Sequence, residues 1–272
     1  MKKNILIIND LCTYGKAALT VNIPILSYLG IEVSPLVSVI LSNHTAFESF
    51  YACSLTEQLE NIVKELKIRK PDFDAFYIGW ISSEKQPEII IDLIQHFKFN
   101  NIMLDPILGD NGKLYSSITD KHINAMRKII KYSTIATPNI TELAILTDKD
   151  PKKQYSENEI VNMCIELEKM GANTIVVTSV EKDSDKIGCL SYSNGNINTI
   201  YNKKINISIP GTGDAFASTL LGFILKNKSI NEALKISTDF VFQMIDEAIK
   251  DNDDIIHGII PEKRLKLLNN YS

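Results

Sequence analysis

The residues best suited to chemistry lie in one short stretch, Ile209-Pro210-Gly211-Thr212-Gly213-Asp214. An apolar run up to Leu225 follows and predicts a helix buried on most sides. A glycine turn that leads into a helix aims free backbone N–H groups, and the positive end of the helix dipole, at one point. Phosphate is the usual occupant of such a site. Asp214 lies in the first turn beside it, where a carboxylate is suited to take a proton from an attacking hydroxyl.

The same residues also fit a plain glycine turn with Asp214 as a helix cap, because short glycine motifs occur in many unrelated proteins. Further polar residues follow five expected strands, and these are Asp10, Thr45, Asp105, Thr137 with Glu142, and Thr178. In a doubly wound sheet such strand ends lie along one edge. Taken singly, Asp105-Pro106 fits a turn and Glu142 fits a first-turn helix acid. Taken together, carboxylates beside a phosphate site indicate Mg²⁺ and phosphoryl transfer.

Short apolar runs alternate with helical patterns along the chain. Strands are expected at 4–8, 31–41, 75–78, 102–104, 133–136 and 174–178, with a hairpin over 187–201 around Asn194-Gly195. Helices are expected at 17–29, 55–66, 87–97, 119–131, from 141, and at 158–170, 214–225, 230–250 and 262–269. This alternation predicts an α/β fold in a single domain over residues 1–272, with a mostly parallel central sheet and helices on both faces.

Composition excludes several classes of partner. The 272 residues are 44% hydrophobic and 23% charged with a net charge of −4, and no basic patch of the kind that nucleic acid needs is visible. No apolar stretch reaches membrane-spanning length, and the run Ile5–Ile8 is too short for a signal peptide. The four cysteines form no Cys-x-x-Cys pair or zinc spacing, so we expect reduced thiols and a cytoplasmic protein.

In this order, the motifs resemble the ribokinase-like superfamily and, within it, the vitamin B6 kinases (pyridoxal or pyridoxamine kinases). The resemblance covers nearly the whole chain. It is carried by Tyr14-Gly15, 41–45, 105–110, Leu114-Tyr115, Thr137-Pro138-Asn139 with Glu142, Val177-Thr178-Ser179 and 211–214. It implies a ribokinase-like domain that uses ATP to phosphorylate the 5′-hydroxymethyl group of pyridoxamine, pyridoxal or pyridoxine in the salvage of pyridoxal 5′-phosphate. It also implies a homodimer.

The resemblance implies a role for each matching residue. Asp214 would be the base, and the backbone of Gly211, Thr212 and Gly213 would form the anion hole. Asp105, Glu142 and Thr137 would organise Mg²⁺, and a monovalent cation is left open. Asp110 and Tyr115, on a flap, would join Asn139, Thr178 and Ser179 in binding ATP. The vitamer would contact Asp10, His44, Thr45 and Trp80, which would stack on its ring unless it is only a core aromatic.

Asp10 departs from the family pattern, because many pyridoxal kinases have serine at the end of the first strand. A serine hydroxyl donates or accepts a hydrogen bond, whereas an ionised aspartate only accepts. An acceptor there would favour the cationic aminomethyl group of pyridoxamine or a protonated ring nitrogen. The alternative is that Asp10 caps the following helix or binds solvent.

Three other functions are weighed against this one. A hydroxymethylpyrimidine kinase would have a glycine-rich loop after the first strand, where only Gly15 is present, and often cysteine in place of Asp214. A sugar kinase would offer more hydroxyl-binding carboxylates than a pocket with Trp80. The presence of Asp214, Asp105 and Glu142 argues against a non-catalytic sensor of B6 vitamers or nucleotide, since a sensor has no need of a base.

Overall fold

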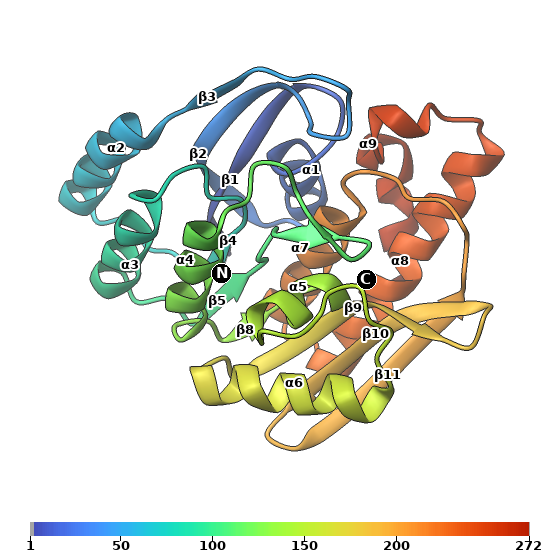
Figure 1. Ribbon diagram of the computed structural model, residues 1–272. Coiled ribbons are helices and arrows are strands. Elements are labelled where there is room, and N and C mark those ends of the chain that lie inside the picture. The colour runs from blue at the N-terminus through green and yellow to red at the C-terminus, as the bar shows by residue number, and fades with distance from the viewer. Residues whose placement is uncertain (1–2, 272) are drawn as a thin grey trace.

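The computed structural model describes residues 3–271, and their strands form a nine-stranded main sheet and a separate two-stranded one. The order across the main sheet is β11-β10-β9-β8-β5-β4-β1-β2-β3 (Figure 1). Pairing is parallel from β9 through β8, β5, β4 and β1 to β2, and β3, β10 and β11 pair antiparallel. The strands are β1 (Asn4–Tyr14), β2 (Glu32–Asn43), β3 (Ala52–Ser54), β4 (Ala75–Ile78), β5 (Asn101–Leu104), β6 (Gly109–Asp110), β7 (Lys113–Leu114), β8 (Ile135–Ala136), β9 (Thr174–Lys182), β10 (Lys186–Ser193) and β11 (Asn196–Lys203).

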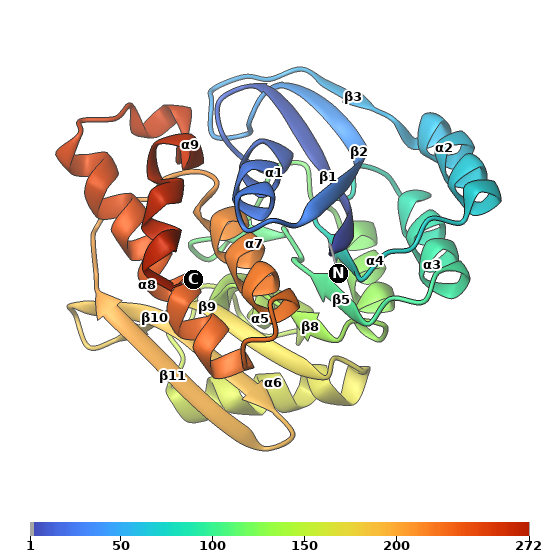
Figure 2. The same cartoon turned by 180° about the vertical axis from the view of Figure 1, so that it is seen from behind.

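Helices cover both faces of the sheet, as the alternating pattern predicts. They are α1 (Leu19–Tyr28), α2 (Thr56–Arg69), α3 (Gln86–His96), α4 (Asp120–Ile130), α5 (Ile140–Leu146), α6 (Glu157–Met170), α7 (Thr212–Leu225), α8 (Ile230–Lys250), α9 (Pro261–Arg264) and the 3₁₀ turns η1 (Ile255–His257) and η2 (Leu265–Tyr271). Helices α1, α7 and α8 lie together on one face of the sheet (Figure 2), and α2 to α6 cover the other. Ile5 and Ile7 of β1 pack in the core of the first face, whereas Leu6 and Ile8 pack in the core of the second. The mostly parallel α/β fold is therefore confirmed.

The first strand is longer than expected, for a physical reason. Ile5 to Ile8 pair with β4 on one side and β2 on the other, so they are buried and apolar. Beyond Ile8, β1 continues to Tyr14 with β2 as its neighbour, after a register shift between Asn9 and Leu11. With only β2 as a neighbour, this part of β1 tolerates polar residues. The apolar run therefore ends at Ile8, where pairing with β4 ends. Asp10 therefore lies within β1, and the expectation that the first strand ends at residue 8 is wrong.

Smaller elements also differ from the expected ones. The sequence does not indicate β3, β6 and β7, and the helix expected at 262–269 is divided into α9 and η2. The hairpin turn is as predicted, since Asn194 and Gly195 both have positive φ angles of 49° and 79°. Among residues 3–271, no helix combines the length and apolar character needed to cross a membrane.

Candidate active site

One cavity, of about 320 Å³, lies beyond the carboxyl ends of the parallel strands and brings together every site residue proposed from the sequence. Its walls include Asp10, His44, Thr45, Trp80, Asp105, Asp110, Tyr115, Thr137, Asn139, Glu142, Thr178, Ser179, Gly211, Thr212, Gly213 and Asp214. Ten further residues, for which no role was predicted, complete the lining: Ala17, Ala18, Leu41, Ala46, Ile107, Ser117, Ser208, Ile209, Pro210 and Phe216. Five of the lining residues are carboxylates, and no lysine or arginine is found among the described ones.

Asp214 lies where the anion motif enters α7. Gly211, with φ of +84°, is the N-cap of this helix, so Asp214 is in its first turn and the helix-cap interpretation is wrong. The Asp214 carboxylate instead accepts hydrogen bonds from outside its helix, from the backbone N of Ala18 at 2.8 Å and from Asn9 Nδ2 at 3.4 Å. Burial raises the pKa of Asp214 to about 6 although these donors oppose the rise. Asp214 is thus ionised near neutral pH and aligned, as a general base must be.

Asp10 is a second buried carboxyl beside Asp214. Its side chain is only 6% exposed, and the Cys12 thiol donates to its Oδ2 at 3.2 Å. Burial, and then the charge of Asp214, raise the pKa of Asp10 to about 7. Helix α1 has Ala18 as its N-cap and no side-chain cap, so the alternative of Asp10 as a helix cap is wrong. Near neutral pH the carboxyl is divided between its protonated and ionised forms, so it can donate as well as accept.

Two asparagines behind the cavity, Asn9 and Asn22, hold these groups, and neither was predicted to belong to the site. Asn9 is fully buried; its Oδ1 accepts from the backbone N of Asp10 at 3.0 Å and of Trp80 at 2.9 Å. Its Nδ2 donates to Asn22 Oδ1 at 3.1 Å as well as to Asp214. Gly79 makes room for it, because a Cβ there would lie 2.5 Å from the Asn9 side chain. An asparagine directly after a run of buried isoleucines was the available signal.

Asp105 and Glu142 form the acidic side of the cavity. Asp105 is 8% exposed and accepts a hydrogen bond from the buried Tyr77 hydroxyl at 3.0 Å, and its pKa is raised well above the usual value by burial and by Glu142. Glu142 is a capping residue of α5, as the simpler interpretation expected. Its two carboxylate oxygens accept from the backbone N of Asn139 and of Leu108, each at 2.9 Å. Burial raises the pKa of Glu142 to about 7.

These two acids fit a divalent cation that other ligands complete. Within residues 3–271, no cluster of three or more His, Cys, Asp and Glu side chains could hold a metal ion by itself. Mg²⁺, however, is commonly held by one or two carboxylates together with waters and substrate phosphates. Asp105 and Glu142 offer hard oxygen donors, and no described lysine or arginine lines the cavity to neutralise them. The donor set therefore suits Mg²⁺ that arrives with a nucleotide.

The β6–β7 hairpin carries the proposed nucleotide-side residues Asp110 and Tyr115. It is tied to the start of α5, because Asn139 Nδ2 donates to Gly109 O at 2.8 Å and the Gly112 N–H donates to Thr141 Oγ1 at 2.9 Å. A second cavity, of about 920 Å³, adjoins the first. The two share Asp110, Thr178, Ser179, Ser208, Ile209, Thr212, Gly213 and Phe216, and the second also has Lys153, Lys203 and Lys204 in its walls. The anion motif thus lies where the two cavities meet.

His44, Thr45 and Trp80 form the opposite wall. Trp80 is 8% exposed and packs in a small core with Cys12, Val39 and Leu41, so it is both a core residue and part of the cavity wall. His44 is 3% exposed, its Nε2 lies 3.4 Å from the carbonyl O of His257, and its Nδ1 has no hydrogen-bond partner. Burial lowers the pKa of His44, so its ring is neutral near pH 7. Thr45 is exposed at the rim.

Backbone strain also gathers at this cavity. Ala18, Ile107 and Ser179 have φ angles of 50°, 45° and 59°, and all three line it. A β-branched residue such as Ile107 rarely adopts this conformation. Strained residues persist where the surrounding structure holds them, and they cluster at functional sites.

Comparison with known proteins agrees with this geometry. The family model described as phosphomethylpyrimidine kinase matches residues 33–261. The chain is 28% identical over 224 residues to the pyridoxal kinase of Ovis aries. The aligned region covers 74% of this chain and 71% of the relative.

Solved structures agree in fold along almost the full length. A Bacteroides thetaiotaomicron protein, named provisionally as a phosphomethylpyrimidine kinase and crystallised with pyridoxal, is 34% identical. The match has a TM-score of 0.94 and covers 99% of this chain and 96% of that one. Pyridoxal kinase from Lactobacillus plantarum, at 24% identity, shares the fold with a TM-score of 0.91 over 99% of this chain and 97% of that one. The chain therefore belongs to the phosphomethylpyrimidine kinase family, with a ribokinase-like fold and with pyridoxal kinases among its relatives.

Proposed function

We propose that this protein transfers the γ-phosphoryl group of ATP to the 5′-hydroxymethyl group of a B6 vitamer, as its pyridoxal kinase relatives are named to do. The observation that carries the proposal is the placement of Asp214 at the start of α7, with its carboxylate held by the Ala18 N–H and facing the cavity. The N–H groups of Thr212 and Gly213 have no main-chain acceptor within the helix because they belong to its first turn. A base and an anion site therefore lie together, as transfer to a hydroxyl requires.

The two adjoining cavities suit two substrates. The first is large enough for a vitamer, with Trp80 as a flat wall and Asp10, His44 and Thr45 as its polar contacts. The second cavity receives the nucleoside of ATP, and the positive charges of Lys153, Lys203 and Lys204 offset the negative charge of the phosphates. Asp110, Thr178 and Ser179 line both cavities, beside the path of the phosphates, and Tyr115 and Asn139 line the first cavity close to them. In-line transfer needs the acceptor and the γ-phosphate to meet, and the anion motif lies at this meeting point.

Mg²⁺ bound with ATP would be held by Asp105 and Glu142, with Thr137 beside them, and it would offset the charge of the phosphates. The contribution of this chain is to keep the two acids buried and oriented, through Tyr77 for Asp105 and two backbone N–H groups for Glu142. A monovalent cation in the same acidic region is part of the proposal. The homodimer rests on the resemblance to the family, and light scattering of the purified protein would test it. The cytoplasmic location rests on the unpaired cysteines.

A coupled kinase assay tests the function. Purified protein with ATP and Mg²⁺ is given pyridoxal, pyridoxamine, pyridoxine or hydroxymethylpyrimidine, and ADP release is followed. We expect turnover with at least one vitamer and far less with hydroxymethylpyrimidine. Preference for hydroxymethylpyrimidine would favour the alternative of a hydroxymethylpyrimidine kinase. Tight vitamer binding without ADP release would indicate a sensor instead of an enzyme.

A further inference from the structure

A segment near the C-terminus, residues 253–264, contacts two separate stretches of chain beside Asp214, one at Lys16 and one at Pro210, although none of its residues lines the cavity. The carbonyl O of His257 accepts a hydrogen bond from Lys16 N at 2.7 Å, and Ile259 N donates to Pro210 O at 2.8 Å. Lys16 precedes Ala18, whose N–H holds Asp214, and Pro210 begins the anion motif. The middle of the segment therefore connects the stretch at Lys16 with the stretch at Pro210, and these two stretches position Asp214.

The fit at this junction is close. Gly258 has φ of +94°, and a Cβ there would lie 2.3 Å from Lys16 O and 3.2 Å from Pro210 O. A Cβ on Gly211 would lie 2.8 Å from the same Lys16 carbonyl and 3.2 Å from the Ile259 side chain. The His257 carbonyl also lies 3.4 Å from His44 Nε2, on the proposed substrate wall. A shift of residues 257–259 would therefore displace Asp214, the anion motif and the proposed substrate wall together.

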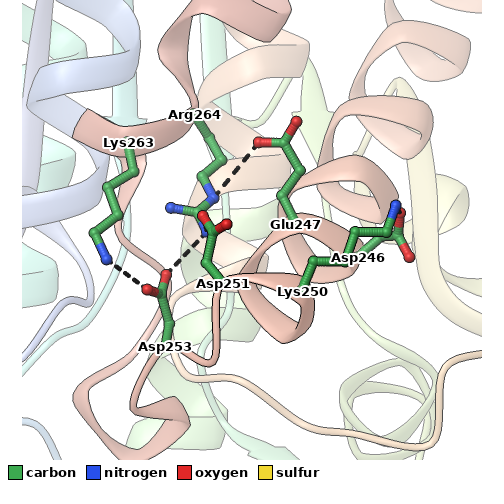
Figure 3. A network of polar contacts seen from close by, with 7 residues as sticks. All are labelled: Asp246, Glu247, Lys250, Asp251, Asp253, Lys263 and Arg264. Carbon is green, nitrogen blue, oxygen red and sulfur yellow. Dashed lines mark hydrogen bonds and ion pairs between the residues drawn. The ribbon is translucent and has the colours of Figure 1, made fainter.

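Arg264 holds the two ends of the segment together. Its side chain is 1% exposed, and its Nη2 lies 3.0 Å from the carboxylate of Asp253 at the other end of the segment (Figure 3). Nη2 also lies 2.6 Å from Asp251, and Nε lies 3.7 Å from Glu247 in the last turns of α8. Lys263 makes a second ion pair with Asp253, whose side chain is only 7% exposed. A short segment closed at its base by buried charges has few conformations open to its middle residues.

We propose that Arg264 is a positioning residue for phosphoryl transfer: by closing segment 253–264 it fixes residues 257–259 against Lys16 and Pro210, and so sets the geometry of Asp214 and the anion motif. This role rests on the proposed kinase function. Arginine suits it because its planar fork reaches several carboxylates from one buried point, which the single ammonium of lysine does not. The expected signature is a loss of turnover with little loss of vitamer binding, because displacements of about 1 Å cost rates of the order of 10²-fold.

The test uses Arg264→Lys, which keeps the charge, and Gly258→Ala, which disturbs the junction directly. The matched control is Lys250→Met, because Lys250 pairs with Asp246 in the same region of α8 but outside the segment. Steady-state kinetics are measured well below the melting temperature of each variant, and amide exchange is followed at Lys16 and Ile259, which bond across the junction. We expect Arg264→Lys and Gly258→Ala to lower kcat by about 10–100-fold, with KM for the vitamer within about threefold. Exchange should be faster at both amides, and the control should match the wild type.

The two readouts separate the outcomes. An inactive wild type would refute the proposed function, while the amide exchange would still test the junction. If Arg264→Lys lowers the melting temperature but keeps both the kcat and the slow exchange of wild type, Arg264 serves stability alone and the proposal is wrong. A change in Lys250→Met as large as in Arg264→Lys would refute it as well, because the effect would then belong to α8 in general.

Discussion

Replacing Asp214 by asparagine removes a base while preserving most of its surroundings. An asparagine Oδ1 can still accept the hydrogen bond that Ala18 N donates at 2.8 Å, and its volume is nearly that of aspartate. The variant should therefore fold and bind ATP much as the wild type does. A positioned base contributes about 10²–10⁴-fold, so we expect kcat to fall by that factor, which is a rise of about 2.7–5.4 kcal/mol in the barrier.

The pKa of Asp214 gives the prediction a second, independent part. With a pKa of about 6, half of the enzyme carries an ionised base at pH 6. In the wild type, kcat/KM should fall about twofold from its plateau at pH 6 and about tenfold at pH 5, and a neutral asparagine should abolish this acidic limb. The neighbouring Asp10 has a pKa of about 7 and interacts with Asp214, so the acidic limb reports the titration of the pair and not of one residue alone.

The assay is ADP release at saturating ATP and Mg²⁺, measured from pH 5 to pH 9 on the wild type and on Asp214→Asn. Asp246→Asn is the control, because it removes an exposed acid of α8 and should leave both rate and profile unchanged. ATP affinity, measured separately, should be similar in all three proteins. Near-normal turnover in Asp214→Asn, or an acidic limb that persists in it, would refute the assignment of the base.

Three further predictions concern the other acids. Asp105→Asn and Glu142→Gln should each raise the Mg²⁺ concentration needed for half-maximal rate, because each removes a negative oxygen; unchanged Mg²⁺ titrations would leave these acids only structural. Asp10→Ser should lower kcat/KM for pyridoxamine more than for pyridoxal, because a charge pair is lost when one partner is removed; an unchanged ratio would exclude Asp10 from the substrate site. Between pH 4 and 7 the folded state binds a proton at Asp10 that the unfolded state has lost. Wild-type stability should therefore fall by at most about 4 kcal/mol from this group as pH rises, and denaturant unfolding of Asp10→Asn should show a shallower fall.

The sequence predicts the layers of this fold well because burial on both faces leaves a clear apolar pattern. Residues 5–8 and 75–78 are strands for that reason, and helix α8 has the predicted bounds Ile230–Lys250. Where only one neighbour pairs, the pattern is lost, and the extension of β1 to Tyr14 could not be predicted from it.

The candidate site follows the same division between local and distant information. The anion motif can be predicted from local sequence, because a glycine with positive φ and the start of a helix determine the residue types of six consecutive positions. The partners of Asp214 are distant, because Ala18 lies 196 residues away in the chain and offers only its backbone N–H. Asn9 and Tyr77 lie within buried strands, and their roles depend on which side chains the fold brings beside them. The contact of residues 257–259 with Lys16 and Pro210 is mostly between backbone atoms, so side-chain identity indicates only Gly258.

The two neighbouring carboxyls Asp10 and Asp214 differ in their donors, and this difference assigns their roles. The Asp214 carboxylate accepts hydrogen bonds from the Ala18 N–H and the Asn9 amide, and both stabilise its ionised form. The Asp10 carboxylate accepts a hydrogen bond from the Cys12 thiol, and the backbone N–H of Asp10 donates to Asn9 Oδ1. When one of the pair ionises first, its charge raises the pKa of the other. The pKa values of about 6 and about 7 have this order, so Asp214 loses its proton first and Asp10 keeps one longer. Two acids whose environments separate their pKa values are suited to different tasks. Under the proposed function, Asp214 would therefore accept the proton from the alcohol, and the protonation state of Asp10 would respond to the charge of the vitamer.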